Sequence, residues 1–319
     1  MACKSRCFAF GRRRAAGRWR AAALAAAFGL ALAGTARAEV LVVATTPDLK
    51  SIAEAVSGGA ARVETLVQPG ADPESFAPRP SHVALLRDAA LVVRVGLGFD
   101  EWLDRLIRQA GDTRPARDGR VLDLSTDIAV LEVQGRSLEA RSGHAHGAAN
   151  PHYWLDPANA ETLSARIAEA IARVAPEAQG AIAAAQARFA VDLKQRLEHW
   201  TAALAPFQGA AVLAYHNSWP YFARRFRLNI VDVIEPKEGV APSPARLAGL
   251  ATRIRASGVR AILHEPFEPT KASHYLAERT GVRVVVLASS VGGAPEATDY
   301  LALFDYNVDR LAKALAEGR

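Results

Sequence analysis

The chain has 319 residues, of which 50% are hydrophobic, and its 39 basic and 33 acidic side chains give a formal net charge of +6 at pH 7. This length supports one large domain or two small ones, and this hydrophobic content argues against both wholesale disorder and a polytopic membrane protein. The positive charge suggests a nucleic acid or a membrane surface as partner only if the basic residues belong to the working part of the chain.

Residues 1–38 have the pattern of a secretory signal peptide. Residues 1–20 contain seven basic residues and no acid, residues 21–33 are wholly apolar, and the segment ends in Ala36-Arg37-Ala38. A basic start, a short apolar core and a small-residue cleavage motif predict export with cleavage after Ala38. The alternative, a membrane-spanning helix, needs about 20 apolar residues, which is more than this run supplies.

Cleavage would change what the composition implies. Residues 1–38 hold eight basic residues and no acid, so 31 basic and 33 acidic side chains remain, a net charge of −2. Cys3 and Cys7 would leave too, which excludes disulfides and thiolate metal sites from the mature chain. Both precede the apolar run, so neither is a lipoprotein acylation site. We therefore predict a periplasmic, monomeric protein with no nucleic-acid partner.

From Glu39 onward, short β-rich runs alternate with amphipathic helical stretches. Strands are predicted at 40–45, 62–67, 91–95 and 121–124, and helices at 51–56, 81–89 and 99–110, with Ser81 as an N-cap. Such a series predicts a parallel sheet with right-handed crossovers. Two helical stretches follow a loop over 125–150.

The second of these helical stretches, over residues 176–205, carries one continuous apolar stripe. Its members are Ile182, Phe189, Leu193, Leu197, Trp200 and Leu204. At 1.5 Å per residue such a helix spans about 45 Å, more than the width of a small domain. It is therefore predicted to connect two lobes.

Beyond Gly209 the alternation resumes. Strands are predicted at 211–215, 230–234, 261–264 and 282–287, and helices at 221–226, 244–256, 271–278 and 299–316, with Ser243 as an N-cap. The predicted fold is α/β, with two βα lobes containing parallel sheets joined by a long rigid helix. Its predicted parts are a signal peptide (1–38), an N-terminal lobe (39–175), a connecting helix (176–206) and a C-terminal lobe (207–319).

Four polar residues lie beyond predicted strands, where open α/β sheets gather functional groups. They are Glu74, His152, His216 and Glu265. Two imidazoles with one or two carboxylates suit Zn(II) or Mn(II). Taken alone, however, each of these residues is more typical of a polar side chain that caps a strand or a helix.

Five segments carry a more specific pattern. Residues 72–81 (DPESFAPRPS), 91–103, 151–157 (PHYWLDP), 216–226 and 235–243 follow one another in this order. They resemble the zinc/manganese-type periplasmic solute-binding proteins of metal ABC transporters (the cluster A-I family). The family's first segment reads D-P-H-x-F/Y-E-P-x-P-S and its third D-P-H-x-W-L-x-P. The resemblance extends over essentially the whole chain from Glu39.

The resemblance implies a binding protein and not an enzyme, with one metal in the cleft between the lobes and delivery to an ABC permease. His152 and His216 match family ligands, and Glu74 replaces a family His with an oxygen ligand. The Asp that the family places near residues 287–291 is absent. Glu265, Asp299 or a water are the alternatives for the fourth ligand.

The implied cargo is Zn(II), with Mn(II) as the alternative because Glu74 favours harder metals. For His144 and His146, in a Gly/Ala-rich loop, transient metal contact and a solvated loop both stay open. Trp154 and Trp219 are predicted to wall the site. Two other functions are weighed: a periplasmic zinc hydrolase, for which no H-E-x-x-H or G-x-S-x-G motif is found, and a binder of an organic or chelated ligand.

Overall fold

Two parallel β-sheets organise the protein, as predicted. The structure is a computed structural model that describes Met1 and residues 39–111, 119–131, 149–237 and 239–317, so the predicted signal peptide and His144 and His146 lie outside the described residues. The first sheet has the order β2-β1-β3-β4 and the second β6-β5-β7-β8. All the pairings are parallel, so both lobes share one topology.

The strands are short and close to their predicted positions. They are β1 (Val40–Ala44), β2 (Ala61–Thr65), β3 (Leu91–Arg94), β4 (Val121–Asp123), β5 (Ala211–Ala214), β6 (Asn229–Val233), β7 (Ala261–His264) and β8 (Arg283–Val286). The four residues of β5 and the four of β7 are all buried. Such buried and mainly apolar runs are expected where helices cover both faces of a parallel sheet.

The helices of the first lobe are α2 (Pro47–Val56), α3 (Pro80–Asp88), α4 (Trp102–Gln109) and α5 (Asn159–Val174). Two predicted starts were wrong. Thr46 caps α2, accepting a hydrogen bond from the Leu49 amide, so this helix begins before residue 51. Ser81 is not the N-cap of α3: Arg79 takes that position, and its amide donates to Nδ1 of His82.

The helices of the second lobe are α7 (Pro220–Phe226), α8 (Pro244–Ala256), α9 (Thr270–Thr280) and α10 (Tyr300–Glu317). The Ser243 N-cap is confirmed, because its Oγ accepts a hydrogen bond from the Arg246 amide. Among the helices of the described ranges, none is both long and apolar enough to cross a membrane.

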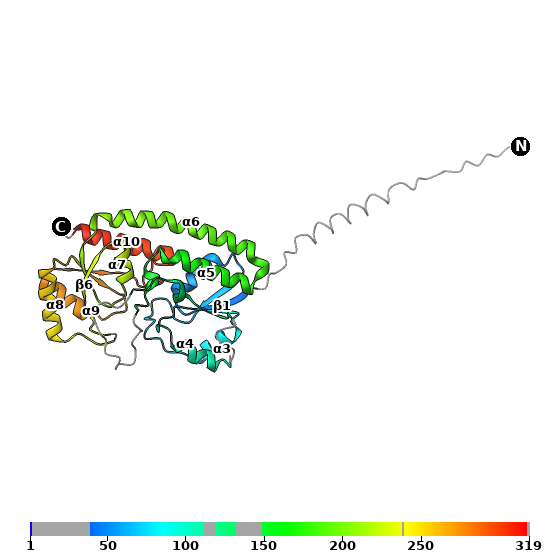
Figure 1. The fold of residues 1–319 in the computed structure, drawn as a ribbon, viewed down its shortest axis with the longest axis horizontal. Helices are drawn as coiled ribbons and strands as arrows, with labels where there is room; N and C mark the ends of the chain where they lie inside the picture. Colours follow the sequence, from blue (N-terminus) through cyan, green and yellow to red (C-terminus); the bar gives the residue numbers. More distant parts are fainter. Residues whose placement is uncertain (2–38, 112–118, 132–148, 238, 318–319) are drawn as a thin grey trace. The chain divides into compact units, whose positions relative to one another are not determined.

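Helix α6 (Gln179–Leu204) is the predicted connector, and Figure 1 shows it running beside α5 and α10. Its 26 residues correspond to about 39 Å. The predicted apolar stripe is buried except for Leu197, which is half-buried. Near its start α6 meets Gly58 of the first lobe, and near its end Trp200 donates to Asp305 of α10. One rigid helix thus packs against both lobes.

Direct hydrogen bonds also join the lobes. The buried Asp48 carboxylate accepts from the Ser290 hydroxyl (2.6 Å) and from the Val291 amide (3.0 Å). Trp154 donates through Nε1 to the Ser289 carbonyl, and the Tyr300 hydroxyl donates to the Trp154 carbonyl. Residues 287–291, where the family resemblance implied an Asp ligand, therefore contribute to the joint between the lobes.

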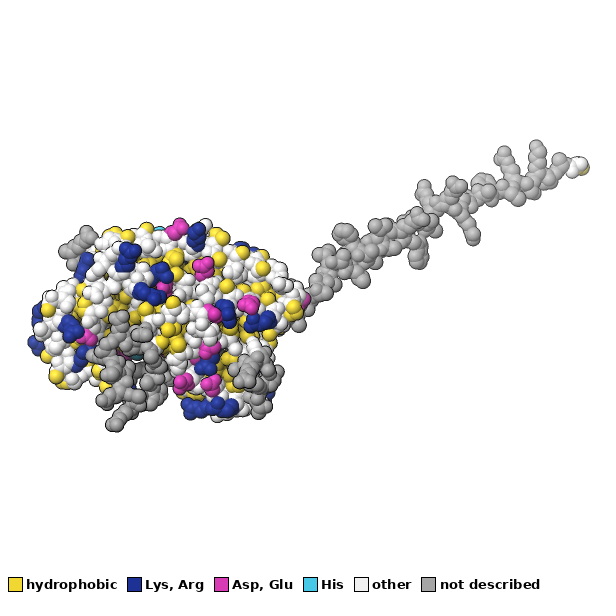
Figure 2. Space-filling view, in the orientation of Figure 1, with side chains coloured by type: hydrophobic (Ala, Val, Ile, Leu, Met, Phe, Trp, Pro, Cys, Tyr) yellow, Lys and Arg dark blue, Asp and Glu magenta, His cyan; other side chains and the backbone are white. Residues whose placement is uncertain are grey.

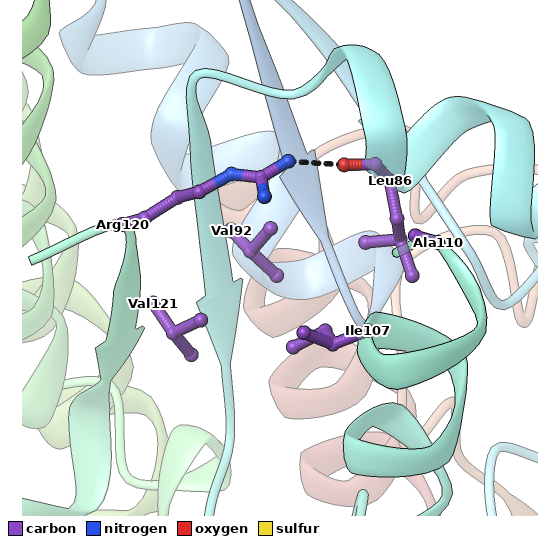
Figure 3. A pocket seen from close by; sticks show the side chains of 6 residues that line it. All are labelled: Leu86, Val92, Ile107, Ala110, Arg120 and Val121. Atoms are coloured by element: carbon purple, nitrogen blue, oxygen red, sulfur yellow. Dashed lines mark hydrogen bonds between the residues drawn. The ribbon is translucent and has the colours of Figure 1, made fainter. Parts of the chain in front are cut away.

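Arg120 completes the packing at the end of α3, where helical carbonyls lack intrahelical partners. Its guanidinium donates to the carbonyls of Leu86 and Ala89, and Figure 3 shows it beside a small apolar space that Val92, Ile107 and others line. On the face in Figure 2, basic and acidic side chains of the described residues are interspersed.

Gly58→Ala is expected to destabilise the protein by about 2–4 kcal/mol, because it combines backbone strain with overpacking. Gly58 has φ +60°, and an added Cβ would lie 2.6 Å from the Ala181 backbone of α6. Gly59→Ala is the control, since Gly59 has φ +77° but open space around it, and about 1 kcal/mol is expected there. Urea unfolding measures the free energy of unfolding of both variants. Equal losses in the two would contradict the close contact between Gly58 and α6.

Asp48→Asn is expected to remove a pH dependence of stability. Burial raises the pKa of Asp48 from 3.8 to about 6, although hydrogen bonds from Ser290 and Val291 oppose the rise. A raised folded-state pKa stabilises the protein below about pH 4, and this contribution is lost as the pH rises to about 6. The shift of roughly 2 units corresponds to about 3 kcal/mol at most.

Thermal or urea unfolding from pH 4 to pH 6 should therefore show the wild type losing stability relative to Asp48→Asn. Asp309→Asn, an exposed change on α10, should follow the wild type. Parallel curves of stability against pH for the wild type and Asp48→Asn would show that Asp48 does not cause this pH dependence.

Candidate metal centre

Three of the four predicted site residues converge where the two lobes meet. Glu74 follows β2, His152 precedes the short turn Tyr153–Leu155, and His216 follows β5. The Nε2 atom of His152 lies 3.4 Å from Oε1 of Glu74, and Nε2 of His216 lies 3.4 Å from Oε2 of the same carboxylate. One ligand atom from each residue falls within 4.8 Å of the others.

These separations fit a shared metal ion better than direct hydrogen bonds. An N–H···O hydrogen bond spans about 2.7–3.2 Å, which is shorter than either contact. Two ligand atoms about 2.0–2.1 Å from a tetrahedral ion lie roughly 3.3 Å apart. The carboxylate therefore presents one oxygen to each imidazole at about the spacing that a single divalent ion requires.

Asn150 orients His152. Its Oδ1 accepts the His152 backbone amide (2.9 Å) and lies 3.1 Å from the ring Nδ1, while its Nδ2 donates to the Asn217 carbonyl. An amide oxygen only accepts, so Nδ1 carries the proton and Nε2 keeps its lone pair. That lone pair points to the Glu74 side of the ring.

Glu235, two residues after β6, orients His216 in the same way. Its Oε2 lies 2.6 Å from Nδ1 of His216, and its Oε1 accepts the Gly239 amide at 2.6 Å. A carboxylate behind a ligating imidazole fixes the tautomer and increases the basicity of the metal-facing nitrogen. Asp72 performs a related task for Glu74, because its Oδ1 accepts the Glu74 amide.

The charges around His216 make the centre strongly cation-attracting. Burial lowers the pKa of His216, but the hydrogen bond to Glu235 and the charges of Glu74 and Glu265 raise it to about 10. In the metal-free protein this ring is therefore protonated near neutral pH. A metal ion that binds Nε2 must displace that proton.

Glu265, the fourth predicted ligand, lies beside this group without joining it. It is fully buried, its Oε1 accepts from Nε1 of Trp219 (2.7 Å), and its Oε2 has no hydrogen-bond partner among the described residues. Burial raises its pKa to about 7. Asp299 caps the start of α10 by accepting from the Leu301 and Ala302 amides. The identity of the fourth ligand stays a prediction.

Two aromatic rings pack against the His152 imidazole. The ring of Trp154 lies 5.1 Å from it, and Phe99 meets it edge-on at 5.7 Å. Trp219 is wholly buried against Phe222 and donates to Glu265, and its place beside His216 stays a prediction. These rings reduce the access of water, which strengthens the interactions between charges inside the centre.

Sequence reasoning missed Asn150, Glu235 and Glu268 as parts of the centre. Like the proposed ligands, Glu235 follows a predicted strand, and Asn150 stands two residues before His152. The sequence therefore contained the information needed to propose both residues. Glu268 is half-buried on the turn after β7. Burial, Glu235 and Glu265 raise its pKa to about 8. His216, Glu235 and Glu268 form a second group whose ligand atoms lie within 4.8 Å.

Two equivalent βα lobes on one long helix, with imidazoles and a carboxylate meeting between them, define a metal-binding protein of the solute-binding class. The sequence profile of the family described as "Zinc-uptake complex component A periplasmic" matches residues 42–314. The chain belongs to this family.

Individual relatives agree with this assignment. The high-affinity zinc uptake system protein ZnuA of Paracoccus denitrificans is 30% identical over 268 residues, covering 74% of this chain and 78% of that protein. A crystal structure of ZnuA aligns with a TM-score of 0.74 and 25% identity over 86% of this chain and 98% of that chain. The Mn2+ complex of FpvC from Pseudomonas aeruginosa shares the fold, with a TM-score of 0.76 and 23% identity over 88% of this chain and 100% of that chain.

Asn150→Ala is expected to weaken metal binding by about 10–100-fold, because His152 loses the acceptor that sets its tautomer. Asn159→Ala is the matched control: its Nδ2 donates to the Tyr153 carbonyl, and it touches neither imidazole. Competition with a chromogenic chelator measures both affinities. Equal affinity in the two variants would show that Asn150 does not position the ligand.

Proposed function

We propose that this chain is exported, captures a divalent transition metal in the periplasm as a monomer, and delivers it to the permease of an ABC transporter. The observation that carries the proposal is the convergence of two imidazole Nε2 atoms on the Glu74 carboxylate. Family membership supports the transport role, and the signal-peptide pattern of residues 1–38 supports export.

The cargo links the two lobes in this mechanism. Glu74 and His152 belong to the first lobe and His216 to the second, so one ion bound to all three joins the lobes. Binding displaces the proton of His216, and affinity therefore falls as the pH decreases. A permease distinguishes loaded from empty protein if the two differ in the balance of their conformations.

Zn(II) is the first choice of cargo and Mn(II) the second. Two imidazoles and a carboxylate match zinc, whereas Glu74, which replaces a family His, and the nearby Glu265 add oxygen atoms that harder ions prefer. The names of relatives in this family refer to zinc uptake, which supports the same order. The family and its relatives are transport proteins, so we infer no catalytic role.

Calorimetric titration of the purified protein with Zn(II) and Mn(II) tests the proposal. The wild type should bind one of them with a Kd of about 1 μM or tighter. His152→Ala should weaken binding at least about 100-fold, because it removes one of three ligands. His199→Ala, an exposed change on α6, should bind like the wild type. No binding of either ion would refute the function, whereas wild-type affinity in His152→Ala would refute only the site.

A further inference from the structure

A second group of potential ligands adjoins the metal centre and shares His216 with it. His216, Glu235 and Glu268 bring one ligand atom each within 4.8 Å of the others. Glu268 stands between the exposed residues Phe267 and Pro269 on the turn after β7. Glu235 of this group is as buried as Glu74 of the metal centre, since both side chains are 7% exposed, and His216 is 14% exposed. Of the residues in the two groups, only Glu268 has exposed residues on both sides, so it lies at their surface end.

The electrostatics of this second group favour a cation. Apart from burial, the charges of Glu235, Glu265 and Asp72 raise the pKa of Glu268, and His216 opposes them. Several carboxylates that converge in a partly desolvated place repel one another, and a divalent ion relieves this repulsion.

Glu265 is an independent indication of a ligand. It is fully buried, its Oε2 has no hydrogen-bond partner among the described residues, and its charge acts on both His216 and Glu268. A buried carboxylate oxygen without a partner is unfavourable, because it has lost its hydrogen bonds to water. A cation held by His216 or Glu268, on both of which the Glu265 charge acts, would interact favourably with this carboxylate.

His216 is common to both groups, and its two nitrogens face different partners. Nε2 faces Glu74, while Nδ1 faces Glu235. A neutral imidazole has only one lone pair for a metal, so the ring serves one position at a time. The two groups are consequently alternative positions for a single ion.

We propose that His216, Glu235 and Glu268 form an outer holding position, which a divalent cation occupies on its way between solvent and the inner group of Glu74, His152 and His216. The ion first binds the Glu268 and Glu235 carboxylates and Nδ1 of His216, which breaks the 2.6 Å hydrogen bond between Nδ1 and Glu235 and releases the Nδ1 proton to solvent. When the ion then moves to Nε2 of the same ring, the Nε2 proton leaves to solvent and Nδ1 takes up a proton again. The Glu235–His216 hydrogen bond re-forms behind it. This inference rests on the proposed function, because it needs metal capture at the inner group.

Stopped-flow measurements of Zn(II) and Mn(II) binding test the proposal, with tryptophan fluorescence as the signal because the Trp154 ring lies 5.1 Å from that of His152. Glu268→Gln preserves the shape and removes the charge. The association and dissociation rate constants should both fall, by about 5–10-fold, because an intermediate position lowers the barrier in both directions. Glu268→Asp should recover most of the rate.

Other outcomes overturn the proposal. A slower association with unchanged dissociation, abolished by high salt, would show long-range attraction only. A faster dissociation would make Glu268 an inner ligand, and wild-type kinetics would give it no role. Glu198→Gln, the same charge change at an exposed position of α6, should leave both rates unchanged. Absence of metal binding in the wild type would refute the proposed function as well, whereas wild-type binding with unaltered Glu268→Gln kinetics would refute only this inference.

Discussion

Helix α6 packs against both lobes, and the metal centre depends on this packing because its ligands come from opposite lobes. Near one end the α6 backbone lies against Gly58, and near the other Trp200 donates to Asp305. Additional hydrogen bonds between Asp48 and residues 290–291 hold the lobes together directly. A helix cannot shorten or bend locally at low cost, so the distance between the lobes is well determined.

The orientation of each imidazole is fixed by a polar side chain at its Nδ1 atom. Asn150 and Glu235 bind the Nδ1 atoms, and both Nε2 atoms consequently face the Glu74 carboxylate. Burial raises the pKa of Glu265, and burial together with the charges of Glu235 and Glu265 raises the pKa of Glu268. Under the proposed function, a bound ion would also reduce the repulsion between the carboxylates around Glu268.

Residues 287–291 have a different role in this chain from the one that the family resemblance implied. Where the resemblance implied an Asp ligand, Ser289 and Ser290 bind Trp154 and Asp48 of the other lobe. The segment stabilises the joint, and the carboxylates of the candidate metal centre come instead from Glu74 and from residues that follow β6 and β7. The negative charge of the centre is thus supplied by different elements.

Much of the fold followed from local patterns. The bounds of β7 and α8 coincide with their predictions, because a short apolar run and a Ser-Pro helix start are determined by neighbouring residues. The connecting helix was evident from its apolar stripe. The starts of α2 and α3 were misplaced, because several nearby residues are able to cap a helix and tertiary contacts select among them.

The sequence by itself determined the two-lobed α/β architecture and pointed to the residues of the candidate metal centre, since both inferences depend on periodicity and on motifs within single segments. Only the tertiary structure decided which side chains meet. It brought Glu74 to His152 and His216 and placed Glu265 beside them. It also placed Asn150 and Glu235 at the Nδ1 atoms of the two imidazoles. The members of these pairs come from different strand ends, loops and lobes. The distances between them depend on the packing of α6, which sequence patterns within a single segment do not predict.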